Sequence, residues 1–248
     1  MRRFGLSLII PVNNEASILK SKLGIIYSYL STLPLIDQFE ILVINNGSSD
    51  NSEEVLAKIS KSIPQIYVEN IPERSLAKAI KIGLTKVKYN AVMLMSVDVS
   101  FGVEIIEKSI KEYLNGFDIV LGSKGHKDSV YKAPLKRLIF SKVYNFIVRY
   151  LFDINVKDTQ GTFVVNKRLI DIYLDELVSL NGAWIQTQIV IYGCALGAKT
   201  KEIPVVYNAG NRKSKLHVSD AIATFQSLFK EYLVYLRWKK QIPDDIHF

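Results

Sequence analysis

The stretch AVMLMSVDVS, residues 91–100, decides how the chain is expected to fold. Its first half is an apolar run rich in Val and Met, with the length and composition of a strand buried inside a sheet. One carboxylate, Asp98, follows the run, between Ser96 and Ser100. In α/β proteins ligands bind beyond the carboxyl ends of the strands. The stretch therefore predicts both a central strand and a binding site at its end.

Apolar runs and helical patterns alternate on both sides of this stretch. The predicted strands are Leu6–Pro11, Phe39–Ile44, Gln65–Glu69, Ala91–Ser96 and Ile119–Gly122. The predicted helices are Ala16–Leu33, Asn51–Ser62, Ser75–Lys86 and Val103–Leu114. Repeated strand–helix–strand units predict an α/β fold with a doubly wound, mostly parallel sheet and flanking helices. The segments 11–15, 45–50 and 96–100 should then meet at one edge of that sheet.

The second half of the chain has a different pattern. A polar loop at 124–133 precedes a long helix predicted at 134–152. After the segment DTQGTFVVNK (158–167) we expect two more helices, a strand at 200–206, the basic loop NAGNRKSK (208–215) and a last helix at 219–238. No repeat or low-complexity linker separates these parts. We therefore expect a single domain, residues 1–248, composed of the halves 1–123 and 124–248.

Composition and charge narrow the classes of function. The chain has 248 residues, 48% of them hydrophobic and 23% charged, which is ordinary for a globular protein. A single cysteine, Cys194, excludes an internal disulfide, and three scattered histidines make a zinc framework unexpected. The net charge of +8 suits a polyanionic partner such as nucleic acid, an anionic membrane or a phosphorylated substrate. No nucleic-acid recognition motif is present, so no nucleic-acid partner is expected.

No segment has the length and apolarity of a membrane span. The longest uncharged candidate, Ile185–Ala198, is interrupted by glutamines and Gly193, and about 18 apolar residues are needed. The start MRRFGLSLIIPVNNE imitates a signal peptide but lacks a small-residue cleavage site, so we interpret it as the first strand. We therefore expect a cytoplasmic protein whose membrane contact is peripheral, on the inner face.

Five segments in order resemble the family 2 glycosyltransferases of GT-A fold. They are SLIIPVNNEASIL (7–19), ILVINNGSSDNS (41–52), VMLMSVDVSF (92–101), DTQGTFVVNKRLI (158–170) and KEIPVVYNAGNRKSKL (201–216). Within that family they are similar to polyprenyl-phosphate sugar synthases, such as dolichol-phosphate mannose or glucose synthase. The resemblance implies the Rossmann-like fold of nucleotide-diphospho-sugar transferases. It also implies sugar transfer from a nucleotide sugar to a polyprenyl (dolichyl) phosphate, with residues 1–123 binding the nucleotide and 124–248 the acceptor.

The resemblance implies nucleotide contacts from the loops after the first two strands. The first loop contributes Pro11, Asn13, Asn14 and Glu15. The family's D-D-G-S-x-D motif reads NNGSSD here, so Asn45 and Asn46 replace both leading acids while Gly47, Ser48 and Asp50 remain. Val97 completes the implied nucleotide-binding set. An amide oxygen can accept a hydrogen bond from a base but carries no charge, and Asn-Gly also suits a turn. The turn role and the nucleotide role are both open.

The metal motif is incomplete. The family uses D-x-D, two acids that hold Mg²⁺ or Mn²⁺ beside the donor's diphosphate, and this chain has Ser96-Val97-Asp98. The resemblance leaves Asp98 and Ser100 as metal ligands, while Asp98 alone would also suit a turn cap. Two further departures are RSLAKA (74–79) in place of a Gly-rich stretch and Gln188 in place of an acid near WIQTQ (184–188). We expect Mg²⁺ or Mn²⁺ to bind weakly and to be dispensable.

A phosphate acceptor has different chemical needs from a hydroxyl acceptor. A lipid phosphate is already anionic at neutral pH, so it needs positive charge rather than a general base. The resemblance assigns catalytic roles to Asp98, Lys124, Arg137, Asp158 and Arg212, with Asp158 orienting the basic groups. It assigns contact with the acceptor phosphate to Ser141, Lys213 and Lys215. The run from Arg212 to Lys215 would also suit a solvated basic face.

The predicted helix 134–152 carries more apolar surface than one buried face requires. Its apolar residues cover roughly half of the circumference, with basic residues at the flanks. This pattern suits contact with a membrane interface. Burial against the last helix, which is rich in Phe, Tyr and Leu, is the alternative, and both can hold on different sides.

Two functions are open at this point. The first is an enzyme that moves a sugar from a nucleotide sugar to a polyprenyl phosphate at the membrane surface. The second is a catalytically impaired GT-A module that binds a nucleotide sugar, a lipid phosphate or a protein partner without turnover. The lost acids favour the second, whereas Asp98 and the basic loops favour the first, which we adopt. The candidate partners are the nucleotide sugar, the lipid phosphate and a separate membrane protein.

Overall fold

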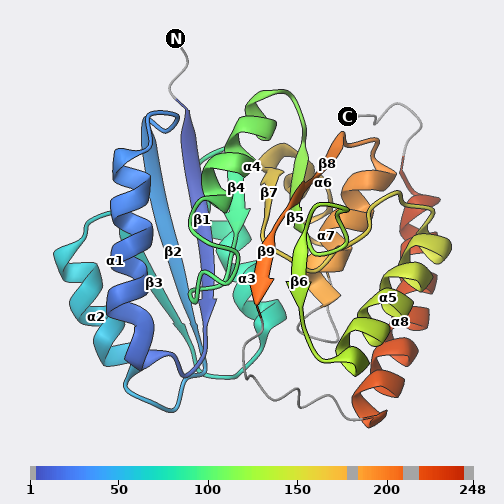
Figure 1. Ribbon diagram of the computed structural model, residues 1–248, viewed down its shortest axis with the longest axis horizontal. Coiled ribbons are helices and arrows are strands. Elements are labelled where there is room, and N and C mark those ends of the chain that lie inside the picture. Colours follow the sequence, from blue (N-terminus) through green and yellow to red (C-terminus); the bar gives the residue numbers. More distant parts are fainter. Residues whose placement is uncertain (1–3, 178–183, 209–217, 243–248) are drawn as a thin grey trace.

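The computed structural model describes residues 4–177, 184–208 and 218–242 (Figure 1). Within these residues the main sheet has the strand order β3-β2-β1-β4-β7-β5-β8. Its strands are β1 (Gly5–Val12), β2 (Gln38–Asn46), β3 (Ile66–Ile71), β4 (Ala91–Leu94), β5 (Ile119–Ser123), β7 (Phe163–Asn166) and β8 (Thr200–Pro204). Only β7 runs antiparallel to its neighbours among the strands described in this sheet. The predicted mostly parallel α/β sheet is confirmed.

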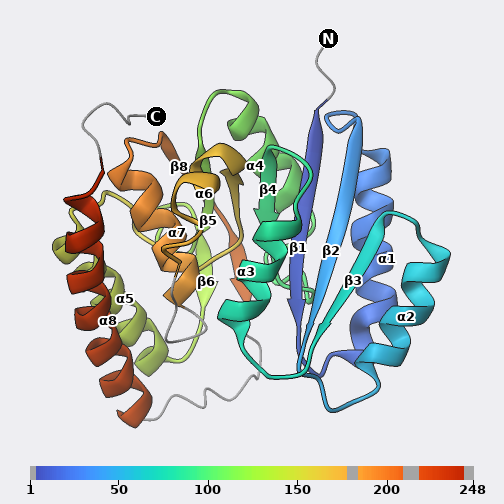
Figure 2. The ribbon, with the colours of Figure 1, turned by 180° about the vertical axis from the view of Figure 1, so that it is seen from behind.

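Helices cover both faces of the sheet, as Figures 1 and 2 show from opposite sides. The helices are α1 (Ala16–Thr32), α2 (Ser52–Ser62), α3 (Leu76–Lys86), α4 (Ile105–Leu114), α5 (Leu135–Phe152), α6 (Lys167–Tyr173), α7 (Trp184–Ala195) and α8 (Val218–Lys239). One apolar cluster joins the sheet to α1, α2 and α4. The other joins it to α3, α6 and α7, and continues outward to α5 and α8. The core therefore forms two layers separated by the sheet.

Strand β7 was not predicted, and it positions the site. The run FVV is only three apolar residues long, so it gave no clear periodic signal. In the structure β7 lies between β4 and β5, with Phe163 opposite both Leu94 and Leu121. This pairing places the preceding segment, residues 158–162, beside the carboxyl ends of β4 and β5.

A second, two-stranded sheet forms from segments that we expected to be a loop and one continuous strand. It pairs β6 (Val130–Lys132) with β9 (Val206–Asn208). The predicted strand 200–206 is divided after Pro204, because the backbone of Val205 bonds to the loop after β5. Its N–H donates to Ser129 Oγ (2.9 Å), and its carbonyl accepts from Val130 N (2.9 Å). These bonds connect the polar loop after β5 to the residue that follows β8 of the main sheet.

Helix α5 has a buried side and an exposed side. Tyr144, Val148 and Phe152 are buried, and the Phe152 ring lies 5.0 Å from the Tyr235 ring of α8, centroid to centroid. On the other side, an apolar stripe at helical spacing is exposed to solvent: Leu135, Ile139, Val143, Phe146 and Tyr150. Burial against α8 accounts for part of the apolar surface and leaves this stripe uncovered by the described residues. No helix in those residues is long and apolar enough to cross a bilayer.

Gly47 and Gly24 allow a comparison of a glycine that the backbone conformation requires with one that it does not. Gly47 has φ of +60°, and a Cβ there would lie 2.6 Å from Arg74 N, whereas a Cβ at Gly24 would meet nothing within 4 Å. We predict that Gly47→Ala lowers the free energy of unfolding by more than about 1 kcal/mol. Gly24→Ala, in the middle of α1, should raise it by about 0.5–1 kcal/mol. Denaturant titration measures both, and equal effects would contradict this account of the turn.

Candidate active site

The loops after β1 and β2 are bonded to each other. Asn14, in the left-handed conformation (φ 57°), accepts at Oδ1 from Ser49 N (2.7 Å) and donates its own N–H to Ser48 Oγ (3.0 Å). Asp50 Oδ2 accepts from Ala16 N (3.0 Å). The hydrogen bond from Ser52 holds the pKa of Asp50 below its ordinary value. These residues were predicted to bind nucleotide. In the structure their hydrogen bonds hold the loops after β1 and β2 together at the edge of the sheet.

The remaining residues of the first loop take part in the same contact. Asn13 Nδ2 donates to the carbonyl of Asn46 (2.7 Å), and Glu15 N donates to Ser52 Oγ (3.1 Å). Pro11 lies at the end of β1, beside a small cavity. The structure therefore brings the first two predicted loops together at one end of the parallel strands. Their contact with a nucleotide stays a prediction.

The two amide side chains that replace acids, Asn45 and Asn46, form hydrogen bonds within the protein. Both are buried. Asn45 Nδ2 donates to Asn70 Oδ1 (2.9 Å), and Asn46 Oδ1 accepts from Ser75 N (2.6 Å) at the start of α3. A carboxylate at position 45 would lack the proton that this first bond needs. The bond to Asn70 thus needs the amide N–H of Asn45, and Asn45–Gly47 has a structural role in the turn.

Asp98 bonds to its own loop. Its Oδ1 accepts from Ser96 Oγ (2.6 Å), Ser100 Oγ (2.8 Å) and Ser100 N (3.2 Å). Val99 has φ of 54°, a left-handed conformation that is strained for a β-branched residue. Strain of this kind is stored where a loop must hold a defined shape, and it is frequent at functional sites. The side chain of Val97 is buried in the core, and its contact with a nucleotide stays a prediction.

The residues present do not make a metal site on their own. Among the described residues no group of three His, Cys, Asp or Glu side chains could hold a metal ion. Mg²⁺ and Mn²⁺ prefer several oxygen ligands with carboxylates among them, and this loop offers one carboxylate with two hydroxyls. The hydroxyls already donate to that carboxylate. The loop alone therefore does not fit Mg²⁺ or Mn²⁺.

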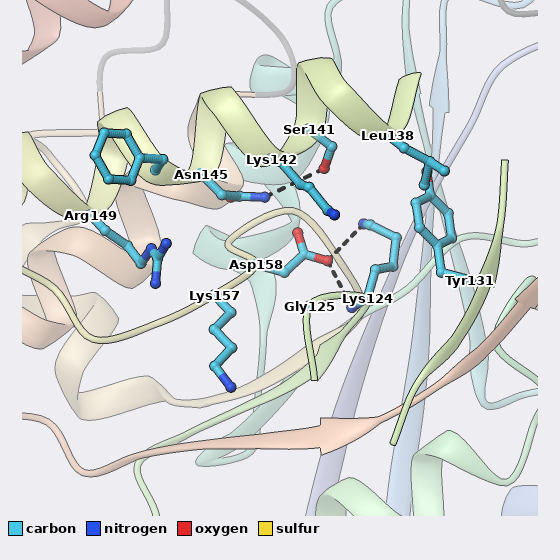
Figure 3. Close-up of a pocket in the computed structure, with 11 residues that line it drawn as sticks. Lys124, Gly125, Tyr131, Leu138, Ser141, Lys142, Asn145, Arg149, Lys157 and Asp158 are labelled. Atoms are coloured by element: carbon cyan, nitrogen blue, oxygen red, sulfur yellow. Dashed lines mark hydrogen bonds and ion pairs between the residues drawn. The ribbon is translucent and has the colours of Figure 1, made fainter. Parts of the chain in front are cut away.

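Two cavities adjoin these loops. The smaller, of about 250 Å³, lies at the strand ends and is lined by Pro11, Ser96 and Ser100 together with Gln160, Gln186 and Tyr207. The larger, of about 440 Å³, lies between α5 and the segments 124–131 and 157–158 (Figure 3). Lys124 lines both. Its side chain therefore stands where the two cavities adjoin.

Lys124 is held by a buried ion pair. Its Nζ lies 3.0 Å from Asp158 Oδ2 and donates to the carbonyl of Gln160 (2.5 Å), while its backbone N–H donates to the same Asp158 oxygen (3.0 Å). The Asp158 side chain is 2% exposed and that of Lys124 is 17% exposed. An ammonium group has three donors, so one remains for a ligand. The geometry suits the predicted orienting role of Asp158, and that role stays a prediction.

Cationic side chains dominate the larger cavity. Lys124, Lys142, Arg149 and Lys157 line it with a single carboxylate, Asp158. Ser141 also lines it, one turn of α5 before Asn145. Figure 3 shows the side chains of Ser141, Lys142, Asn145 and Arg149 projecting from α5 into this space. Leu138 and Phe146 add apolar surface to the same wall.

Not every predicted site residue falls here. Arg212, Lys213 and Lys215 lie outside the described residues, and Arg137 is placed only as a backbone position in α5, four residues before Ser141. Gln188 does not face the site: it is buried and donates to Glu231 of α8 (2.9 Å). Gln186 lines the smaller cavity instead, because residues two apart on a helix point to different sides.

Several cavity residues were missed by the sequence analysis. They are Gln160, Gln186, Tyr207, Lys142, Asn145, Arg149 and Lys157. The spacing of Lys142, Asn145 and Arg149 along α5 was a usable signal, since residues three and four apart share a helix face. The others come from separate elements that only the fold brings together. Cys194 takes no part, because burial raises its pKa to about 12 and keeps the thiol protonated.

Residues 7–173 match the model of the glycosyl transferase family 2. The chain belongs to glycosyl transferase family 2. The match spans both predicted nucleotide loops, the Asp98 loop and Asp158. The expected family membership is therefore confirmed.

Relatives of this family 2 glycosyltransferase include two with named activities. A dolichyl-phosphate beta-glucosyltransferase of Trichomonas vaginalis is 28% identical over 238 residues, 91% of this chain and 72% of the relative. A dolichol-phosphate mannosyltransferase of Pyrococcus furiosus is 26% identical over 98% of this chain and 66% of the relative. This chain thus spans about two thirds to three quarters of the length of these two proteins.

Solved structures confirm the GT-A fold. Glucosyl-3-phosphoglycerate synthase of Mycobacterium tuberculosis, crystallised with Mn²⁺, uridine diphosphate and phosphoglyceric acid, superposes with a TM-score of 0.65 at 15% identity, over 98% of this chain and 81% of that chain. A mannosyltransferase of Pyrobaculum calidifontis, in complex with GDP-Man and Mn²⁺, superposes with a TM-score of 0.61 at 17% identity, over 96% of this chain and 65% of that chain. At these identities the likeness establishes the fold.

The lone carboxylate leads to a prediction about metal binding. We expect Mn²⁺ to bind hardly at all without a nucleotide, because the loop supplies one charged ligand. Ser96→Asp should increase the Mn²⁺-dependent affinity for a nucleoside diphosphate by about tenfold, and Asp98→Asn should remove the dependence. Titration calorimetry at several Mn²⁺ concentrations measures this, with Ser31→Asp on α1 as the control for an added charge. Identical curves for the wild type and both loop variants would mean that Asp98 is a turn residue alone.

Proposed function

We propose that this protein transfers a sugar from a nucleotide sugar to a polyprenyl (dolichyl) phosphate at the surface of a membrane. The observation that carries the proposal is the position of Lys124 in the walls of both cavities. A cavity at the strand ends can take the donor, and an adjacent cationic cavity can take an anionic acceptor. The reacting groups would then meet beside one fixed ammonium group.

The donor is assigned to the smaller cavity. It lies beside the end of β1 and the Asp98 loop, which is the edge where α/β proteins bind ligands. The neighbours of known structure were crystallised with uridine diphosphate and with GDP-Man, which supports a nucleotide sugar here. The nucleotide contacts would come from Pro11–Glu15, from Asn45–Asp50 and from the backbone of Val97.

The acceptor is assigned to the larger cavity. Its cationic wall suits a phosphate, while Phe146 and Leu138 suit an apolar chain. Phe146 is 61% exposed and belongs to the apolar stripe of α5, so the cavity opens onto that stripe. The named relatives are dolichyl-phosphate sugar transferases, which supports a lipid phosphate. We place its phosphate between Lys124 and Ser141, near Arg137; contacts from Arg212, Lys213 and Lys215 remain predictions.

The chemistry needs no general base. An oxygen of the acceptor phosphate attacks the anomeric carbon of the sugar, and the bond from that carbon to the donor diphosphate breaks, releasing a nucleoside diphosphate. The acceptor is already anionic, because the second pKa of a phosphate monoester is about 6. Lys124, held by Asp158 and the carbonyl of Gln160, orients the acceptor and stabilises the negative charge on the leaving diphosphate. Mg²⁺ or Mn²⁺ is proposed as a weak, dispensable cofactor.

The location proposed is peripheral, on the cytoplasmic face of a membrane. The stripe Leu135, Ile139, Val143, Phe146 and Tyr150 is an amphipathic surface, and Lys136 and Lys142 on the same helix are exposed. Such helices lie in the membrane interface with their apolar face inward. A separate membrane protein that covers the stripe is the alternative partner.

Transfer assays test the reaction. We predict that the purified protein moves labelled sugar from a uridine or guanosine diphosphate sugar to dolichyl phosphate, and that Lys124→Ala lowers kcat by about 10²–10³ because a preorganised cation is lost. Lys58→Ala, on the exposed surface of α2, is the control and should leave kcat unchanged. Nucleotide binding without any transfer would favour the non-catalytic module. No binding of any nucleotide would refute the donor site.

Vesicle sedimentation tests the location. We predict binding to anionic vesicles that weakens with salt. Replacing Ile139 and Tyr150, which are exposed and outside the cavity, by Ser should reduce it several-fold without lowering thermal stability. Ile25→Ser on α1, another exposed apolar residue, is the matched control. If both sets of variants bind like the wild type, the stripe of α5 is not the membrane contact.

A further inference from the structure

Two buried polar atoms in the wall of the larger cavity have no hydrogen-bond partner. They are Nε of Arg149 and Oδ1 of Asn145. The residues are four apart on α5, so they are neighbours on one face of the helix. One atom is a donor and the other an acceptor. A buried polar atom left unbonded is unfavourable, so a ligand group that bonded to these atoms would be stabilised here.

The charges around these atoms are also uncompensated. Among the described residues, the side chains of Lys142, Arg149 and Lys157 form no ion pair. The carboxylate of the cavity wall, Asp158, is already paired with Lys124. In Figure 3 Arg149 extends from α5 toward the cavity, and Lys157 starts beside Asp158 and extends away from α5, with no bond drawn to either side chain. This end of the cavity therefore offers positive charge to an anion.

We propose that Arg149, Lys157 and Asn145 form a second phosphate-binding position in the cavity. The guanidinium of Arg149 can donate in a fork to two phosphate oxygens, which a lysine cannot do. Asn145 Oδ1 can accept from a hydroxyl, either of a protonated phosphate or of a group esterified to it. The ammonium of Lys157 adds a second charge. The ligand class is thus a phosphate with a neighbouring hydroxyl.

This position is separate from the one assigned to the acceptor. Ser141 and Arg149 are eight residues apart on α5, about 12 Å along the helix axis. One phosphate group does not span this distance, so we assign the second position to a phosphate group other than the acceptor's. Only this separation of roles rests on the proposed function, because that function assigns the Lys124–Ser141 end to the acceptor lipid.

The opening of the cavity indicates where the second phosphate comes from. Phe146 lines the cavity between Asn145 and Arg149 in sequence and is exposed in the apolar stripe of α5. A phospholipid headgroup at a membrane surface would reach Arg149 from that side, whereas a soluble phosphate would use the same contacts without the stripe. An anionic phospholipid held here would fix the protein on the leaflet beside the acceptor.

The experiment compares matched variants on vesicles. Phosphatidylcholine vesicles with and without phosphatidylglycerol, whose headgroup is a phosphate with hydroxyls, are sedimented with the wild type, Arg149→Gln, Arg149→Lys and Arg168→Gln. Arg168, exposed on α6 and outside the cavity, is the control for loss of a surface charge. We expect Arg149→Gln to weaken binding to the phosphatidylglycerol vesicles at least fivefold, about the effect of one basic residue at an anionic surface. Arg149→Lys should retain part of the binding that Arg149→Gln loses, and Arg168→Gln should leave binding to these vesicles nearly unchanged.

A soluble arm separates the two sources of phosphate. If inorganic phosphate raises the Tm of the wild type but not of Arg149→Gln, while vesicle binding does not distinguish the variants, the position takes soluble phosphate. If Arg149→Gln behaves like Arg168→Gln on vesicles and inorganic phosphate shifts both Tm values equally, the proposal is wrong. Melting without phosphate checks that the variants fold. A wild type that binds no nucleotide would refute the proposed function and leave the vesicle comparison intact.

Discussion

The buried ion pair of Lys124 and Asp158 is the contact on which the arrangement of the site depends. Lys124 follows β5 and Asp158 precedes β7, so the pair forms only because β7 lies antiparallel beside β5. A carboxylate that is 2% exposed must be paired and hydrogen-bonded, since an unpaired buried charge is strongly destabilising. Asp158 meets this demand with the side chain and the backbone N–H of Lys124 and with Gln160 N. The same bonds hold Lys124, which lines both cavities.

The departures from the family's acidic motifs have structural compensation. Asn45 donates to Asn70, Asn46 accepts from the start of α3, and Ser96 donates to Asp98. The first of these bonds needs an amide proton and the last a hydroxyl proton, which an ionised acid at either position would lack. The chain has therefore replaced negative charge at the strand ends by neutral hydrogen bonds. A diphosphate placed there would meet less repulsion and would depend more on cations such as Lys124.

The sequence predicted the parts of the site that follow strands and missed those that gather across the fold. Pro11, Ser96 and Ser100 line the smaller cavity, as their positions after apolar runs indicated. The sequence analysis singled out Gln188 as a departure from the family, whereas Gln186 of the same helix lines the smaller cavity; α7 is apolar on nearly all sides, so its sequence gave no direction toward the site. Arg149 and Lys157 were missed because they lie on different elements, and no spacing in the chain relates them.

The sequence by itself determined the α/β class, the alternation of strands and helices in the first half of the chain, and the family. It could do so because periodic apolar runs and loop motifs are local signals. It also determined that Asp98 stands without a second acid. Only the tertiary structure decided that β7 inserts between β4 and β5, that Lys124 pairs with Asp158, and that α5 keeps an exposed apolar stripe beside a cationic cavity. These depend on contacts between residues distant in the chain, whose geometry the packing of the sheet and its helices sets.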